Sequence, residues 1–352
     1  MHSYQRYQAL DGLRGLAALA IVIWHEPNWF PYLRLPTAHI AVDLFFVISG
    51  FVIAASYESR LKAGLSVSSF MLIRIIRLYP FYLFGTLISI ISLVLSFLSR
   101  GTISEFHLAL WRAALFSAFM LPSPSFGILG NLYPLNIPAW SLHFEIIINI
   151  IWALTYKSWS GPILYFLTAT FGLLLLIFPD FAQGGNSYDN YGQGLARVCF
   201  SFPAGVLIYR LRDYFSTTRK FNIIYLALFF LFATSLPFGI WTPFIVVFVL
   251  PILVGLSINS SLHPRTTVIL SIVGTASYGL YAIHMPLMSL VNASISKLNL
   301  TAPSFIIGVI FLFTTFLFSL IATKYYEIPA RKFLARNLIK KSSTTHVKVN
   351  NE

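Results

Sequence analysis

Eleven apolar segments, separated by short polar stretches, run along this chain and leave it few folds to adopt. Segments of this length and composition are candidates for helices that cross a hydrocarbon core about 30 Å thick. Because backbone groups inside a bilayer must bond to one another, we expect an all-α, polytopic bundle of transmembrane helices. The segments lie near residues 9–25, 38–57, 78–98, 106–121, 138–156, 162–178, 195–210, 221–237, 240–257, 268–291 and 303–324.

The composition supports a membrane protein and excludes other classes. Of the 352 residues, 57% are hydrophobic and only 10% are charged, whereas a soluble domain typically carries about 25% charged residues. The single cysteine, Cys199, lies inside an apolar segment. It offers neither a disulfide framework nor a cysteine-based metal site, and we expect no metal.

The distribution of lysine and arginine decides how many segments cross the membrane. The weakest candidate is 106–121, which contains Arg112 and leads into a stretch with prolines and glycines. If this segment stays outside and the N-terminus is cytoplasmic, 18 of the 24 lysines and arginines fall on the inner side and four on the outer side. Cytoplasmic loops carry such an excess, so we expect about ten spans with both termini cytoplasmic.

This topology predicts two regions of different character. A transmembrane domain occupies residues 1–335, and a basic cytoplasmic tail over residues 336–352 lies on anionic lipid. The net charge of +13 follows from the inward bias of lysine and arginine. The charge is therefore explained without a nucleic-acid partner, and the expected partner is the lipid bilayer.

Arg14 and His25 stand at opposite ends of the first apolar segment. Eleven helical steps of about 100° come within roughly 20° of three whole turns, so both side chains share one face. At about 1.5 Å per residue they lie roughly 16 Å apart along the helix axis. A cation and an imidazole on one face of a membrane helix are costly in lipid, so we expect them to line the bundle interior or a water-filled path.

The other polar residues of the spans fall into two layers. Each also has a structural reading, as a positive-inside anchor or as a hydrogen-bond partner between helices. Ser277, Tyr281 and His284 are spaced i, i+4 and i+7, which predicts one stripe on a helix. We expect an outer layer with His25, Asp43, Trp140, Ser141, Glu145 and His284, and an inner layer with Arg14, Arg74, Arg77, Glu327 and Arg331.

Six short strings carry these residues. The first runs from Leu13 to His25 and holds an arginine and a histidine with ten residues between them. The others are Val42–Phe51, Arg74–Pro80, Ala139–Leu142 followed by Glu145, Ser277–Pro286 and Tyr326–Arg331. In this order, over roughly residues 7 to 335, they resemble the motifs of the acyltransferase 3 family, the integral-membrane O-acyltransferases of cell-surface carbohydrates.

The resemblance implies a donor, an acceptor and a location. The donor is an acyl-CoA, expected to be acetyl-CoA, and the acceptor is a hydroxyl of a cell-surface or lipid-linked carbohydrate. The location is the bacterial cytoplasmic (inner) membrane. Arg74, Arg77 and Arg331 are expected to hold the CoA phosphates, because guanidinium forks match phosphate geometry. Arg14 is expected at the entry of a path toward the outer layer.

The chemistry implied by the resemblance centres on His25. A neutral imidazole acts as general base on the acceptor hydroxyl, or accepts the acyl group first. Asp43 or Glu145 is expected to orient it. Tyr281 and His284 are candidates for stabilising the oxyanion. Trp140 and Ser141 are expected to bind substrate, and the outer stretches Leu121–Pro138 and Pro179–Gln193 to offer the acceptor surface.

Two other functions fit some of these features. Intramembrane charges at two depths also describe a transporter or flippase, although no inverted repeat relates the two halves of the sequence. A third reading is a transmembrane acyl carrier that feeds a separate extracytoplasmic transferase. Some family members carry an esterase-like domain after the membrane part, whereas this chain ends soon after Arg331. The chemistry is therefore expected in the membrane domain or in such a partner, and the oligomeric state stays open.

Overall fold

The computed structural model describes residues 7–100, 105–124, 130–215, 221–234, 238–260, 262–298 and 304–339. Within these ranges the regular elements are helices, and strand-like pairing is limited to one isolated bridge between Asn131 and Ser187. The predicted all-α class is confirmed. The division into a domain and a basic tail stays a prediction, since residues 340–352 of that tail lie outside the described residues.

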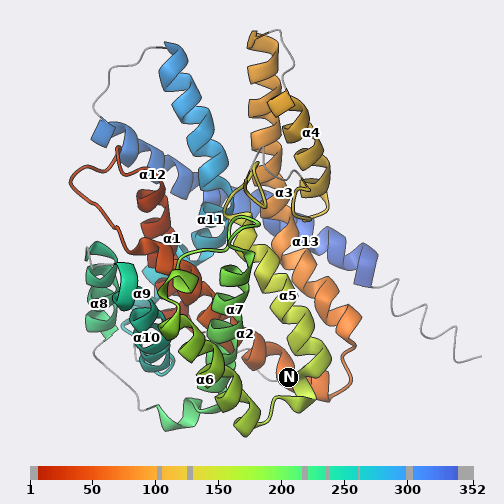
Figure 1. Ribbon diagram of the computed structural model, residues 1–352, viewed down its shortest axis with the longest axis vertical. Helices are drawn as coiled ribbons and strands as arrows, with labels where there is room; N and C mark the ends of the chain where they lie inside the picture. The colour runs from red at the N-terminus through yellow and green to blue at the C-terminus, as the bar shows by residue number, and fades with distance from the viewer. Residues whose placement is uncertain are drawn as a thin grey trace, which may run out of the picture.

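The α-helices follow the predicted apolar segments, with longer ends in several cases (Figure 1). Short π-helical turns join α9 to α10 (Ile245–Val249) and α12 to α13 (Thr323–Glu327). The helices are α1 (Gln8–His25), α2 (Ala41–Lys62), α3 (Val67–Arg100), α4 (Glu105–Ala118), α5 (Ala139–Thr155), α6 (Gly161–Ile177), α7 (Tyr191–Arg210), α8 (Phe221–Ala233), α9 (Phe238–Phe244), α10 (Leu250–Ser257), α11 (Pro264–Leu298), α12 (Ser304–Ala322) and α13 (Ile328–Leu334).

Length and hydropathy identify an integral membrane protein. Among the described residues, 5 helical stretches are long and apolar enough to cross a bilayer. Four shorter apolar helices accompany them, one of which is Leu108–Ala118 in the segment that we expect outside. The count of ten spans and the cytoplasmic termini stay predictions. The long stretches are Ala38–Lys62, Val67–Leu95, Ala139–Ser158, Pro264–Ile295 and Ser304–Ile339.

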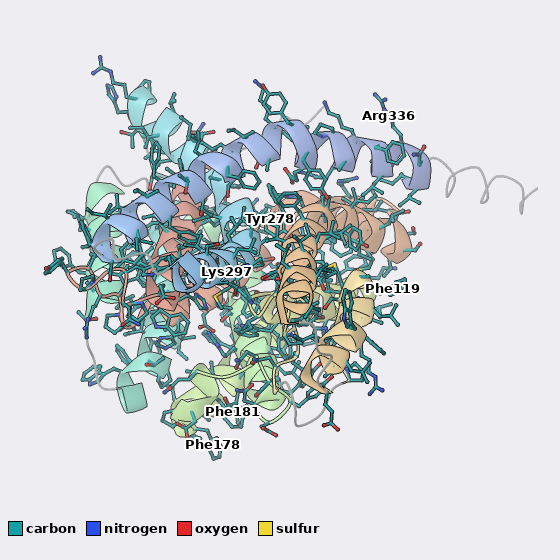
Figure 2. The ribbon with its side chains drawn as sticks, turned by 90° about the horizontal axis from the view of Figure 1, so that it is seen from above. Phe119, Phe178, Phe181, Tyr278, Lys297 and Arg336 are labelled. Atoms are coloured by element: carbon teal, nitrogen blue, oxygen red, sulfur yellow. The ribbon has the colours of Figure 1, made fainter. Side chains whose placement is uncertain are left out.

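The outer surface of the bundle is apolar. Phe166 on α6 and Phe313 on α12 are 68% and 66% exposed. Figure 2 shows Phe119 and Phe178 at the rim of the molecule, whereas Tyr278 lies inside it. Large exposed apolar side chains on several helices are what lipid contact requires, because lipid tails solvate them as well as a protein core does.

Two parallel helix pairs organise the interior. α1 packs along α11, and α2 packs along α7. In the second pair Asp43 contacts Arg197 near one end, and Glu58 contacts Arg210 near the other, so α2 and α7 run in the same direction. The stretch from α12 to α13 crosses α11 and α3 obliquely (Figure 1). The parallel pairing brings residues at equal depth side by side.

Two glycines let α2 and α7 approach backbone to backbone. A Cβ atom at Gly205 would overlap the carbonyl oxygen of Val47, and one at Gly50 would overlap that of Phe202. Small residues permit such close crossings in membranes.

Replacing Gly205 by alanine is therefore expected to destabilise the protein by about 1–3 kcal/mol, as overpacking does. Gly161→Ala is the matched control, because a Cβ atom there would meet no atom within 4 Å. Thermal unfolding of the purified variants measures both effects. Equal unfolding midpoints for the two variants would contradict the close crossing.

Candidate active site

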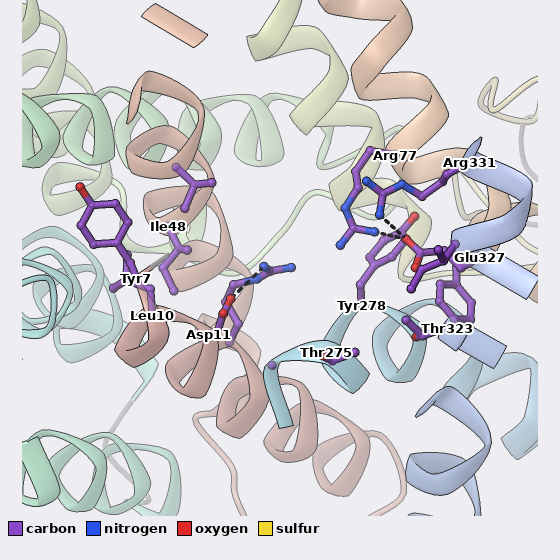
Figure 3. A pocket seen from close by; sticks show the side chains of 15 residues that line it. Tyr7, Leu10, Asp11, Ile48, Arg77, Thr275, Tyr278, Thr323, Glu327 and Arg331 are labelled. Atoms are coloured by element: carbon purple, nitrogen blue, oxygen red, sulfur yellow. Dashed lines mark hydrogen bonds and ion pairs between the residues drawn. The ribbon is translucent and has the colours of Figure 1, made fainter. Parts of the chain in front are cut away.

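A buried carboxylate gathers two arginines at one end of the bundle. Arg77 on α3 and Arg331 on α13 both donate to Oε1 of Glu327, with Arg331 Nη1 at 3.0 Å (Figure 3). The Glu327 side chain is 3% exposed. The ring of Tyr278 lies 5.2 Å from the Arg77 guanidinium carbon and covers one face of it. The two cations are therefore held in place before any ligand arrives.

Arg14 on α1 faces the same space. It lies 4.0 Å from Asp11 and lines a cavity of about 260 Å³ together with Arg77 and Arg331. Figure 3 shows Asp11 of α1 on one side of this cavity and Arg77, Tyr278 and Arg331 of α3, α11 and α13 gathered around Glu327 on the other. Three arginines of the predicted inner group, Arg14, Arg77 and Arg331, therefore share this cavity, whereas Arg74 does not line it.

A larger cavity of about 770 Å³ continues from this group through the middle of the bundle. It is lined by Arg14, Arg74, Arg77 and Arg331, and also by Ser141, Glu145 and Tyr281. Seven of the site residues expected from the sequence therefore face one continuous space. His25, Asp43, Trp140 and His284 do not line it.

The structure corrects the expected depth of Arg74 relative to Glu145. Its Oε1 accepts from Arg74 Nη2 at 2.5 Å and from Ser49 Oγ at 2.8 Å. The expected separation of Glu145 and Arg74 into two layers is therefore wrong. The reason is the length of α3. This helix begins at Val67, so Arg74 lies about 10 Å along it from its first residue rather than in the loop before it.

Ser141 and Tyr281 line the large cavity and contact each other. Ser141 Oγ and Tyr281 Oη lie 2.8 Å apart, and each lies 3.1 Å from the carbonyl oxygen of Pro138. This triangle uses both hydroxyl hydrogens, one toward Pro138 and one between the side chains. Phe45 packs edge-on against the Tyr281 ring, with centroids 5.4 Å apart.

His284 and His25 meet one helical turn beyond Tyr281. His284 is fully buried, and its Nδ1 lies 2.8 Å from the carbonyl oxygen of Tyr281 and 3.1 Å from that of Leu280. Carbonyl oxygens only accept, so Nδ1 carries the hydrogen and Nε2 carries the lone pair. His284 Nε2 lies 3.3 Å from His25 Nδ1.

The same reasoning fixes the tautomer of His25. Its Nδ1 lies 2.9 Å from the carbonyl oxygen of Ile21 and also faces His284 Nε2. Nδ1 is therefore a donor, and the lone pair is on Nε2 of this half-buried ring. His284 in this tautomer has no N–H to offer an oxyanion; it orients His25 instead. The expectation that Asp43 or Glu145 orients His25 is wrong.

Asp43 belongs to a different contact group. Arg197 on α7 donates to both of its carboxylate oxygens, from Nε at 3.0 Å and from Nη2 at 2.7 Å. Arg197 Nη1 also donates to the carbonyl oxygen of Gly184 at 2.8 Å, and its guanidinium carbon lies 5.2 Å from the centre of the Trp140 ring. Asp43 and Trp140 thus hold Arg197, which fastens the loop before α7. Arg197 was not predicted as a partner, although a lone intramembrane charge requires one.

The two outer loops expected to form one surface do contact each other. Ser123 N donates to Leu132 O at 2.7 Å, Leu132 N donates to Asn186 O at 2.8 Å, and Tyr188 Oη donates to Ser123 O at 2.6 Å. Burial raises the pKa of Tyr188 and that of Tyr133, so both stay neutral donors. Residues 125–129 of the first loop lie outside the described residues.

Several cavity residues escaped the sequence reasoning. Tyr57, Arg60, Tyr209 and Arg212 line the large cavity where α2 and α7 end. In the sequence Arg60 and Arg212 look like ordinary positive-inside loop residues, and Tyr57 and Tyr209 look like the last residues of apolar segments. Within the described ranges, no group of three histidine, cysteine, aspartate or glutamate side chains is placed to hold a metal ion.

An arginine-lined cavity that reaches Tyr281, one helical turn from a histidine pair, lies inside an apolar helix bundle. This arrangement is that of a membrane-embedded site for an anionic ligand. A sequence model described as an acyltransferase domain matches residues 7–324 of the chain. The chain therefore belongs to the acyltransferase 3 family, as its motifs predict, and is an O-acyltransferase of the membrane.

Three relatives support the assignment. Peptidoglycan O-acetyltransferase OatA of Listeria monocytogenes is 25% identical over 94% of this chain and 57% of its own length. Protein 2 in the picA locus of Rhizobium radiobacter is 37% identical over 42% of this chain and 82% of its own length. Acyltransferase MdmB of Streptomyces mycarofaciens is 33% identical over 43% of this chain and 40% of its own length. No solved structure matches the chain.

Proposed function

We propose that this protein transfers an acyl group, acetyl in the first instance, from cytoplasmic acyl-CoA to a hydroxyl of a cell-surface or lipid-linked carbohydrate. The enzyme would act in a bacterial cytoplasmic membrane. The observation that carries the proposal is the continuity of the site: Tyr281 lines the arginine-rich cavity, and its backbone carbonyl accepts from His284, which contacts His25.

The charge of the large cavity supports a polyanionic donor. Its lining includes six arginines, whereas Glu145 is the one carboxylate among the lining residues that the structure describes. CoA carries a diphosphate and a phosphomonoester, and the latter alone has a charge of about −1.5 to −2 at pH 7. The flexible pantetheine arm would extend the thioester past the Ser141–Tyr281 pair toward His25.

The transfer step follows from the tautomer of His25. The lone pair on Nε2 takes the proton of the acceptor hydroxyl while the hydroxyl oxygen bonds to the thioester carbonyl carbon. The C–S bond then breaks, and the proton passes from the imidazolium to the CoA thiolate, leaving an ester and free CoA thiol. His284 Nε2 accepts from His25 Nδ1–H and holds the ring in the reactive tautomer. An acyl-imidazole intermediate would use the same lone pair.

The acceptor class rests on the outer loops and on one relative. In the expected topology the contacting loops lie on the same side as His25, and they carry polar side chains such as Asn131 and Asn186, which are joined at 3.0 Å. OatA is named for O-acetylation of peptidoglycan. A sugar hydroxyl in a surface glycan is therefore the acceptor that we test.

The test uses the full-length protein in oriented proteoliposomes, with labelled acetyl-CoA on the cytoplasmic side and a glycan acceptor on the other. Covalent label in the glycan is the expected result. Free labelled compound in the lumen, without esterified glycan, would instead identify a transporter. Label that leaves the protein only when a second transferase is added would identify an acyl carrier.

A further inference from the structure

Two arginine–tyrosine pairs face the large cavity where α2 and α7 end. The Arg60 guanidinium carbon lies 5.0 Å from the centre of the Tyr57 ring, and that of Arg212 lies 4.5 Å from the centre of the Tyr209 ring. All four side chains line the cavity, on the same side as the cytoplasmic ends of both helices in the expected topology. We call these four residues the cavity mouth.

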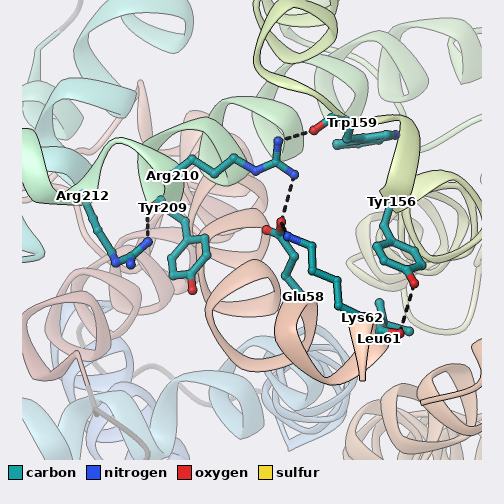
Figure 4. A network of polar contacts seen from close by, with 8 residues as sticks. All are labelled: Glu58, Leu61, Lys62, Tyr156, Trp159, Tyr209, Arg210 and Arg212. Atoms are coloured by element: carbon teal, nitrogen blue, oxygen red, sulfur yellow. Dashed lines mark hydrogen bonds and ion pairs between the residues drawn. The ribbon is translucent and has the colours of Figure 1, made fainter. Parts of the chain in front are cut away.

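The rings of the mouth are fixed by the core beneath them. Tyr57 packs edge-on against Phe70 at 5.1 Å, and Tyr209 packs edge-on against Phe51 at 5.7 Å. Both phenylalanines are fully buried. Arg212 Nη1 donates to the carbonyl oxygen of Tyr209 at 2.9 Å (Figure 4). Rigid aromatic faces with a guanidinium on each give a preformed platform rather than two mobile surface side chains.

The deeper arginines of the cavity are largely neutralised, but those of the mouth are not. Arg74 pairs with Glu145, and Arg77 shares Glu327 with Arg331. In the described part of the chain no carboxylate pairs with Arg60, and Arg212 has only Asp213, at 3.8 Å and 81% exposed.

The neighbouring cations at this end are already engaged. Glu58 accepts from Lys62 at 2.8 Å and from Arg210 at 3.1 Å (Figure 4). Arg210 also donates to the carbonyl oxygen of Trp159. The uncompensated positive charge at this end of the cavity is therefore that of Arg60 and Arg212.

We infer that the mouth binds the phosphorylated nucleoside end of the acyl donor, with Arg60 and Arg212 on its terminal phosphomonoester and a tyrosine ring against its base. Guanidinium forks match phosphate oxygens, and bases stack on aromatic rings. This inference rests on the proposed function, because a donor whose thioester reaches Tyr281 leaves its nucleotide end at the mouth. An anionic lipid headgroup offers the same phosphate chemistry and is the alternative source.

The test compares two donors that differ by one phosphate, acetyl-CoA and acetyl-3′-dephospho-CoA. It uses full-length protein in nanodiscs of zwitterionic lipid. In Arg60→Ala and in Arg212→Ala, KM for acetyl-CoA is expected to rise roughly tenfold, with kcat unchanged. KM for the dephospho donor is expected to stay at the wild-type value. Arg265→Ala, a substitution of an exposed arginine that does not line the cavity, is the matched control.

A binding measurement separates this inference from the proposed function. Adenosine 3′,5′-bisphosphate is expected to bind wild-type protein roughly tenfold more tightly than adenosine 5′-monophosphate, and to lose that preference in both variants. If acetyl transfer proceeds but the variants raise KM for both donors equally, or for neither, the inference is wrong and the proposed function stands. If the bisphosphate binds but neither donor is consumed, the proposed function is wrong and the mouth is a nucleotide site.

A separate experiment tests whether an anionic lipid headgroup occupies the mouth instead. Nanodiscs with phosphatidylglycerol replace the zwitterionic ones, and thermal stability is compared between the wild type and the two variants. Stabilisation by phosphatidylglycerol that requires Arg60 and Arg212, with no preference for the bisphosphate, would assign the mouth to a headgroup and overturn the inference.

Discussion

Replacement of His25 by alanine is expected to lower kcat for acyl transfer by about 10²–10⁴-fold, the range that a positioned general base contributes. The structure gives the reason, because the tautomer of the histidine pair leaves the lone pair on Nε2 of His25. KM for the donor is expected to change little, since His25 does not line the arginine-rich cavity. Steady-state kinetics with labelled acetyl-CoA measures both parameters.

Two further variants define the role of the pair. His284→Ala is expected to lower kcat because His25 Nδ1–H then keeps only the Ile21 carbonyl as an acceptor and the ring is held less firmly. His284→Gln is expected to restore part of kcat, because its amide oxygen can take the place of Nε2. His263→Ala, on an exposed residue before α11, is expected to leave kcat unchanged. Full activity in His25→Ala would show that another group takes the proton.

Replacement of Arg197 by alanine is expected to have the largest effect on stability, about 3–5 kcal/mol, because it leaves the buried Asp43 carboxylate without a countercharge. The two side chains are 2% and 0% exposed. The loop at Gly184 also loses a hydrogen bond. Thermal unfolding and limited proteolysis of that loop measure the loss.

A double replacement tests whether the charge itself causes this loss. The double variant Asp43→Leu, Arg197→Met is expected to have a stability much closer to that of the wild type than a variant that loses only one of the two charges. The reason is that an apolar pair needs no countercharge. Lys62→Ala provides the control, because Lys62 is 63% exposed and such surface pairs contribute roughly 0–1 kcal/mol. A double variant as unstable as Arg197→Ala would point to packing rather than to charge.

The fold class and the family could be predicted from the sequence because apolar length and motif order are local properties. Three of the predicted site residues, Arg14, Arg77 and Arg331, do line one cavity, and their roles stay predictions. Their partners were not predicted, because these depend on which helices lie side by side. The parallel pairing of α1 with α11 and of α2 with α7 leaves no periodic signal within any one helix.

Helix ends explain the errors in depth. An apolar segment near residues 78–98 places Arg74 in the cytoplasmic loop, whereas α3 begins at Val67 and carries Arg74 into the bundle. There the arginine donates to Glu145, which lies near the start of α5. Hydropathy predicts the apolar part of a helix. It does not predict the polar turns that extend the helix beyond that part and carry charged side chains toward the bundle interior.

The contact between His25 and His284 has a consequence for biogenesis. The two residues are 259 positions apart in the chain, and N-terminal parts are made first during synthesis. Helix α1 is therefore in place long before α11 emerges from the ribosome, and until then the Nδ1–H of His25 has only the Ile21 carbonyl as its acceptor. Because Tyr281 and His284 are both on α11, we expect acyl transfer only once this helix has joined α1, near the end of translation.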